Sequence, residues 1–122
     1  LIAHLFHQFV LTSTFCYVDD IIDGLIKLMA SGESGPVNLG SQDVYVLEDV
    51  AKAIIGITES KSKIIYKEPF PYHEKESIPN IALAKEKLEW LPVTGIEEGL
   101  FKTVQDMRAS DIISFKNKAL SA

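Results

Sequence analysis

The sequence predicts an α/β fold, because segments with helical periodicity alternate with short runs of β-branched and aromatic residues. Two further observations narrow this class. The 122 residues are 47% hydrophobic and 24% charged, which is typical of a globular domain or of a piece of one. The chain also begins with Leu rather than Met, so we expect it to be a fragment of a longer protein.

Two segments in the first half of the chain have the apolar spacing of amphipathic helices. The first begins near Val18 and carries acidic residues in its first turn, where they complement the positive end of the helix dipole. Residues 31–36 are rich in Gly, Ser and Pro and should end it. The second helix is predicted within residues 47–55.

Two more helices are expected in the second half. One should start after Pro79 with Asn80 as its N-cap and close at Trp90, whose indole we assign to core packing. The other should run from residue 97 to residue 108, with Leu100, Phe101 and Val104 turned inward. The polar tail, residues 110–122, has only a weak apolar pattern and is expected to fray.

Two short strands are predicted, at residues 37–39 and 63–67, the second ended by the prolines that follow it. The apolar opening segment, residues 1–10, is expected to form a terminal helix with His4 and His7 on one face. We expect no metal there, because zinc needs at least three suitable ligands and His73, the only other histidine, is distant in sequence.

The charge and the composition exclude several classes of function. A net charge of −5 disfavours nucleic-acid and membrane-surface binding, which need concentrated positive charge. No apolar run approaches the ~20 residues of a membrane span. The single Cys16 cannot form an internal disulfide and is interpreted as a buried small hydrophobe. Asp19, Asp20 and Asp23 are explained by the helix start rather than by acid/base catalysis.

Five segments, in matching order and spacing, resemble motifs of one enzyme family. They are Phe15-Cys16-Tyr17-Val18-Asp19-Asp20 with its helix, Gly35-Pro36-Val37-Asn38-Leu39-Gly40, Ser60-Lys61-Ser62-Lys63-Ile64, Pro79-Asn80-Ile81-Ala82-Leu83-Ala84-Lys85, and Trp90-Leu91-Pro92 with Glu97-Glu98-Gly99-Leu100. Together they resemble the C-terminal, substrate-binding portion of the extended short-chain dehydrogenases/reductases that act on sugar nucleotides, and within that group UDP-glucuronate decarboxylase, also called UDP-xylose synthase. We therefore divide the chain into a divergent segment (residues 1–14), a substrate-side portion (residues 15–109) and the tail.

The resemblance implies a complete enzyme that uses NAD to convert UDP-glucuronate to UDP-xylose. Its N-terminal Rossmann half would hold NAD on a glycine-rich turn, and a Tyr-x-x-x-Lys pair would supply the base. Neither motif occurs in this sequence, so we expect no catalytic residue, no cofactor-binding residue and no bound NAD in this chain alone. A sugar-nucleotide epimerase or 4,6-dehydratase is an alternative within the class. A non-catalytic remnant or interaction module is an alternative outside it.

The resemblance also places a UDP-sugar site, at which this chain departs from the family. Ser13 and Ser77 stand where relatives carry arginines that pair with the diphosphate, so binding of a UDP-sugar should be weak or lost. Lys75 could partly replace a guanidinium, and Tyr72 could stack on uracil or bond to the sugar. For Lys75 the alternative is a solvated loop position.

Three helix ends depart from the family as well. Val46 stands at a threonine N-cap position, and Glu59 and Glu89 stand where glycines end helices. Without its Rossmann partners, the chain should expose an apolar helix face and the edge of the strand at 37–39, and be marginally stable or self-associate. The compartment stays open between cytoplasm and Golgi, since a targeting segment would lie upstream.

Overall fold

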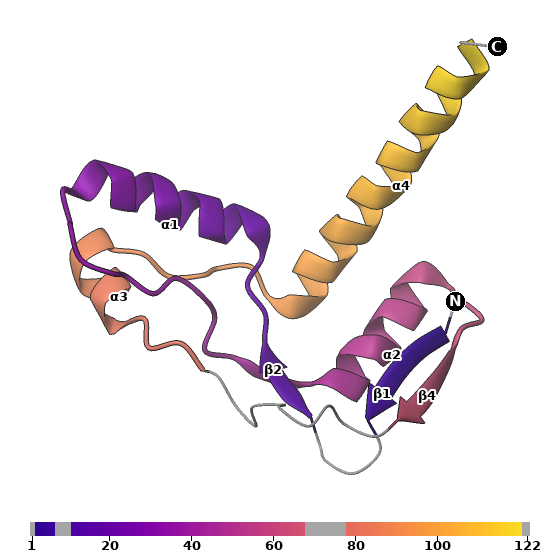
Figure 1. Ribbon diagram of the computed structural model, residues 1–122, viewed down its shortest axis with the longest axis horizontal. Helices are drawn as coiled ribbons and strands as arrows, with labels where there is room; N and C mark the ends of the chain where they lie inside the picture. The colour runs from indigo at the N-terminus through magenta and orange to yellow at the C-terminus, as the bar shows by residue number, and fades with distance from the viewer. Residues whose placement is uncertain (1, 7–10, 68–77, 121–122) are drawn as a thin grey trace.

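The structure is a computed structural model that describes residues 2–6, 11–67 and 78–120. Helices and strands alternate along the chain, so the predicted α/β class is confirmed (Figure 1). The strands are β1 (Ile2–Phe6), β2 (Thr12–Thr14), β3 (Val44–Val46) and β4 (Lys63–Lys67). The helices are α1 (Val18–Ser31), α2 (Leu47–Thr58), α3 (Ala82–Leu88) and α4 (Ile96–Leu120).

The four strands of the described part form two separate two-stranded sheets. β1 and β4 are parallel, with Ile2 opposite Lys63 and Phe6 opposite Lys67, and α2 packs beside them. β2 and β3 are antiparallel, and Ser13 lies opposite Tyr45. Each sheet therefore has two open edges within the described part of the chain, and neither sheet has the three or more strands that normally make a sheet stable by itself.

Two secondary-structure predictions are wrong. The opening segment is a strand over residues 2–6 rather than a helix, and backbone pairing places His4 opposite Ile65. Pairing with a distant strand overrides the local pattern there; His7 and His73 lie outside the described residues. The segment 37–39 is not a strand, because no strand in the described part of the chain pairs with it; the Asn38 side chain instead donates to the Asn80 carbonyl, at 3.2 Å. The next strand along the chain is β3, at Val44–Val46.

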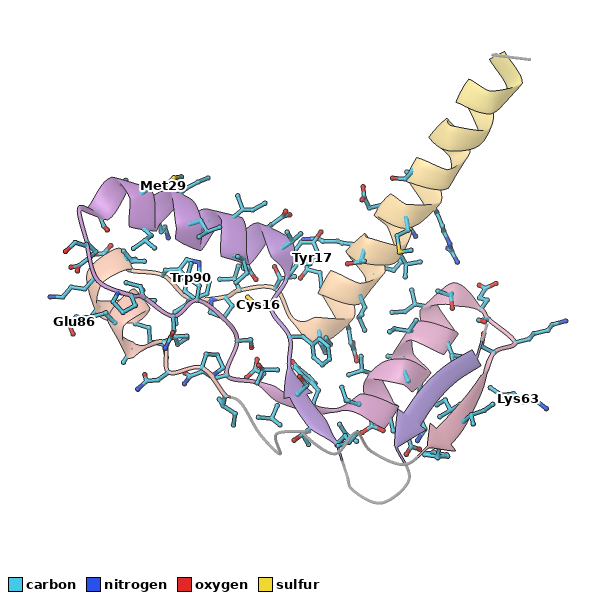
Figure 2. The ribbon with its side chains drawn as sticks, viewed as in Figure 1. Cys16, Tyr17, Met29, Lys63, Glu86 and Trp90 are labelled. Atoms are coloured by element: carbon cyan, nitrogen blue, oxygen red, sulfur yellow. The ribbon has the colours of Figure 1, made fainter. Side chains whose placement is uncertain are left out.

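The core lies between α1 and α3 and is centred on Trp90 (Figure 2). The Trp90 side chain is fully buried, which confirms its assignment to the core, and its Nε1 donates a 2.9 Å hydrogen bond to the Asp20 carbonyl. Gly24 allows α1 to approach, since a Cβ there would lie 3.0 Å from the indole and 2.9 Å from Leu39. Ile81, Ala84 and Leu88 complete the buried cluster.

The three residues that depart from the family pattern at predicted helix ends do lie at helix ends in the structure. Glu59 (φ 53°) ends α2 and Glu89 (φ 48°) ends α3, both in the left-handed region, where an L-residue costs about 1 kcal/mol more than glycine. Gly32 (φ 73°) ends α1 without this cost. Val46 is the N-cap of α2 and offers no side-chain bond. The chain therefore carries strain that glycine would relieve at two helix ends.

The last two helices differ in detail from the prediction. α3 starts one residue late, with Ile81 at the N-cap, although Asn80 Oδ1 still accepts from the Ala82 amide at 3.0 Å. α4 continues to Leu120, so the described part of the tail, residues 110–120, is helical rather than frayed. Phe101 is 53% exposed rather than inward. The reason is that α4 contacts α2 but projects away from the other described elements (Figure 1), so part of its surface is left uncovered.

Candidate functional site

The exposed face of the β2–β3 ribbon gathers one predicted site residue and two aromatic rings. Ser13 and Tyr45 are directly opposite across the antiparallel pair, so their side chains leave the same face. Phe15 follows Ser13 by two residues, and its ring centroid lies 6.4 Å from that of Tyr45 at an interplanar angle of 57°. Ser13 and Phe15 are exposed and Tyr45 is half-buried. The face offers a hydroxyl beside two ring surfaces.

Residues 38–42, which precede β3, hold residues 79–80 close to this ribbon. Gln42 Nε2 donates to the Pro79 carbonyl at 3.3 Å, three residues before Tyr45. Gly40 permits the contact, since a Cβ there would lie 2.9 Å from the Pro79 ring. The described segment that begins at Ile78 therefore lies next to the residues that lead into β3.

Only Ser13 of the four predicted substrate-binding residues is placed by the structure. Tyr72, Lys75 and Ser77 lie outside the described residues, so their grouping with Ser13 stays a prediction. Sequence reasoning missed Tyr45 and Phe15 as members of this face. The signal was present in the alternation of Val44, Tyr45 and Val46, but the partner strand had to be known before the shared face could be seen.

A small cavity of about 140 Å³ lies between the start of α1 and the start of α4. Phe15, Cys16, Tyr17, Ile96 and Leu100 are among its lining residues. It is far smaller than the ~300–1,000 Å³ of ligand pockets, so a nucleotide does not fit. Burial raises the pKa of the Cys16 thiol, and the Asp20 carboxylate raises it further. The thiol is thus neutral, and the Cys16 side chain packs against the core but is half-buried rather than buried.

A larger hollow of about 550 Å³ is rimmed by opposite charges. Its carboxylates belong to Asp19, Asp20, Asp23 and Glu89, and its cations to Lys27 and Lys85. Lys27 is already engaged, since its Nζ lies 3.1 Å from Asp23 Oδ2. The excess of negative charge disfavours a diphosphate in this hollow.

The described residues do not fit the pyrophosphate of NAD. Dinucleotides bind where a helix N-terminus presents free N–H groups and no competing negative charge. Each of the three longest helices instead starts with two carboxylates, which are Asp19 and Asp20 in α1, Glu48 and Asp49 in α2, and Glu97 and Glu98 in α4. Asp19 and Asp20 occupy the first turn of α1, where the sequence placed them.

The described residues contain neither a metal-binding cluster nor a membrane-spanning helix. No group of three or more His, Cys, Asp or Glu side chains is arranged to hold a metal ion in this part of the chain. No helix there combines the length and the apolar character that crossing a membrane requires.

Comparison with known proteins identifies relatives for most of the chain. No protein-family model matches it. It is 34% identical over 97 residues to UDP-glucuronic acid decarboxylase 3 of Arabidopsis thaliana, a match that covers 80% of this chain and 28% of the relative. It is 38% identical over 94 residues to UDP-glucuronic acid decarboxylase 1 of Danio rerio, covering 77% and 22%. The chain thus spans about a quarter of the length of the relatives it matches.

Solved structures give the same fold. The UDP-glucose 4-epimerase of Thermotoga maritima, solved with UDP-glucose, superposes with a TM-score of 0.80 at 30% identity and covers 88% of this chain and 35% of its own. The UDP-glucuronic acid 4-epimerase of Bacillus cereus, in complex with UDP-glucuronic acid and NAD, gives 0.73 at 18% identity, covering 85% and 35%. The expected resemblance and fold class are therefore confirmed. The chain is related to UDP-glucuronic acid decarboxylases and has the fold of one part of an extended short-chain dehydrogenase/reductase.

Proposed function

We propose that this chain, as a relative of the UDP-glucuronic acid decarboxylases, supplies the sugar-nucleotide side of a UDP-glucuronate decarboxylase-like enzyme and does not turn over substrate alone. The observation that carries the proposal is its similarity to these decarboxylases over 80% of its length. The β2–β3 face supports it, because Phe15 and Tyr45 offer ring surfaces beside the hydroxyl of Ser13. Aromatic rings bind nucleobases by stacking.

A second candidate function is a non-catalytic module that no longer binds nucleotide. The neutral Ser13 favours it, because a serine hydroxyl offers one donor where an arginine would offer two parallel charged bonds to phosphate. The carboxylates around the larger hollow favour it too, since they add no attraction for a diphosphate. The two candidates differ in one measurable quantity, which is the affinity for UDP and its sugars.

The isolated chain is expected to convert no UDP-glucuronate to UDP-xylose when NAD is supplied. It has no Tyr-x-x-x-Lys pair and no glycine-rich turn, and the carboxylates at the N-termini of α1, α2 and α4 repel a pyrophosphate. The measurement is chromatographic detection of UDP-xylose after prolonged incubation, with a full-length decarboxylase as the positive control. Product formation above the protein-free blank that scales with chain concentration would refute the proposed lack of turnover.

The chain is also expected to bind UDP weakly, and the double substitution Ser13→Arg with Ser77→Arg should tighten binding at least tenfold. Each restored charge-assisted contact contributes roughly 1.5–3 kcal/mol, and about 1.4 kcal/mol is a factor of ten in affinity. Titration calorimetry with UDP measures the change. The matched control is Ser34→Arg with Ser110→Arg, which adds the same charge at exposed positions away from the ribbon. Equal gains in both double variants would show nonspecific attraction and remove the UDP-sugar site from the proposal.

A further inference from the structure

We propose that Asn38 and Gln42 are positioning residues of the UDP-sugar site, which hold the segment that begins at Ile78 beside the β2–β3 face. They act through the backbone that they hold and do not touch the ligand. The inference rests on the proposed function and adds two residues to it. Neither residue is among the substrate-binding residues that the sequence predicts.

The two side chains bind successive backbone carbonyls of the same segment. Asn38 Nδ2 donates to the Asn80 carbonyl at 3.2 Å, and Gln42 Nε2 donates to the Pro79 carbonyl at 3.3 Å. The connection from α1 to β3 supplies both donors, and its trace runs beside the trace that leads into α3 (Figure 1). One hydrogen bond would let the segment turn about it, whereas two bonds to adjacent peptide groups fix its direction as well as its position.

The donor side of this contact is fixed to the β2–β3 ribbon. Gln42 lies two residues before β3, and the neighbouring Ser41 is buried, with its Oγ accepting a hydrogen bond from the Asp43 amide at 3.1 Å. Gly40 allows the close approach, because a Cβ there would lie 2.9 Å from the Pro79 ring. A displacement of Pro79 relative to this connection is therefore also a displacement relative to the ribbon.

The acceptor side is held by the core at one end. Ile81 is only 2% exposed and belongs to the Trp90 cluster, which fixes the segment where it enters α3. At the other end Ile78 is 46% exposed. The two amide contacts therefore bind the segment at the point where it leaves the core.

Position, rather than stability, is what these two bonds contribute. Both bonds are exposed, so water can replace either partner and their loss costs the fold little. Binding groups must nevertheless be held within about 0.5 Å, usually by supporting hydrogen bonds of this kind. Ile78 is bonded directly to Ser77, a predicted substrate-binding residue, so a loosened segment weakens binding before it weakens the fold.

The first test measures the position of the segment. Spin labels on Ser13→Cys and Ile78→Cys, in a chain that also carries Cys16→Ala, report the distance between β2 and the segment by pulsed electron paramagnetic resonance. Asn38→Ala with Gln42→Ala should roughly double the width of the distance distribution. The urea midpoint should shift by less than about 0.5 M, because only exposed bonds are lost. An unchanged distance distribution overturns the proposal.

The second test measures ligand binding. In a chain that carries Ser13→Arg and Ser77→Arg, the same two alanine substitutions should weaken UDP binding about tenfold by titration calorimetry, because a displacement of about 1 Å is enough for such a loss. The matched control is Gln105→Ala, which removes an exposed side-chain amide from α4 and should leave the distance distribution and the affinity unchanged. An equal loss in the control, or UDP binding that the alanine substitutions leave intact, overturns the positioning role.

The positioning role and the proposed function can fail separately. If the double-arginine chain binds no UDP, the UDP-sugar site is refuted, and with it any role of Asn38 and Gln42 in that site. If that chain binds UDP but the alanine substitutions lower its urea midpoint by more than about 0.5 M, the two amides support the fold itself. The positioning role is then refuted while the UDP-sugar site stands.

Discussion

Replacing Trp90 with alanine is expected to unfold most of the chain at 25 °C. The indole is the largest fully buried side chain in the described part, and Phe/Trp→Ala changes in cores cost about 3–5 kcal/mol. The substitution also removes the hydrogen bond to the Asp20 carbonyl. The free energy of unfolding of an intact domain is only about 5–15 kcal/mol. Because few side chains support this core, the loss approaches the whole free energy of unfolding of the chain.

Urea unfolding followed by far-ultraviolet circular dichroism measures this loss without relying on tryptophan fluorescence. Trp90→Phe keeps most of the ring volume and removes the N–H, so it should cost about 1–2 kcal/mol. The matched control is Leu91→Ala, one residue along and 51% exposed, for which a change within about 0.5 kcal/mol is expected. If Trp90→Ala lost less than about 1 kcal/mol, the α1–α3 cluster would not be the core that holds the chain together.

The elements that could be predicted from the sequence are those that depend on residues close together in the chain. The starts of α1 and α2 and the bounds of β4 follow from periodicity and from the prolines after β4. The left-handed ends at Glu59 and Glu89 could be expected only from the glycines that the related family carries there. Trp90 could be assigned to the core because a single large aromatic next to a helix end has few other roles. These features depend on contacts within a few residues.

The features that could not be predicted depend on distant partners. β1 exists because it pairs with β4, about sixty residues away, whereas segment 37–39 has no partner strand in the described part of the chain. The candidate site likewise depends on residues that are distant in sequence. Ser13 could be singled out by comparison with a family motif, but its neighbour Tyr45 emerges only from the register of β2 and β3. Register is not written in either strand alone.

Replacing Asp20 with alanine is expected to cost about 3 kcal/mol, although the neighbouring Asp19→Ala should cost little. Asp20 is only 6% exposed, and its Oδ2 accepts hydrogen bonds from the amides of Val93 (3.2 Å) and Thr94 (2.9 Å). The carboxylate thus ties the first turn of α1 to the loop between α3 and α4. Charge-assisted bonds of this kind contribute roughly 1.5–3 kcal/mol each, and their loss leaves two amides without their acceptor.

Three variants separate this tie from the effect of a first-turn charge. Asp19→Ala removes an exposed carboxylate from the same turn and tests only the helix dipole, so its cost should be about 0.5 kcal/mol. Asp20→Asn keeps a carbonyl acceptor but loses the charge and should fall between the two alanine variants. Hydrogen exchange gives a second readout, since the Val93 and Thr94 amides should exchange faster in Asp20→Ala than in Asp19→Ala. Equal unfolding free energies and equal exchange in the two alanine variants would mean that Asp20 acts only as a helix-start charge and that the loop is held by Trp90 alone.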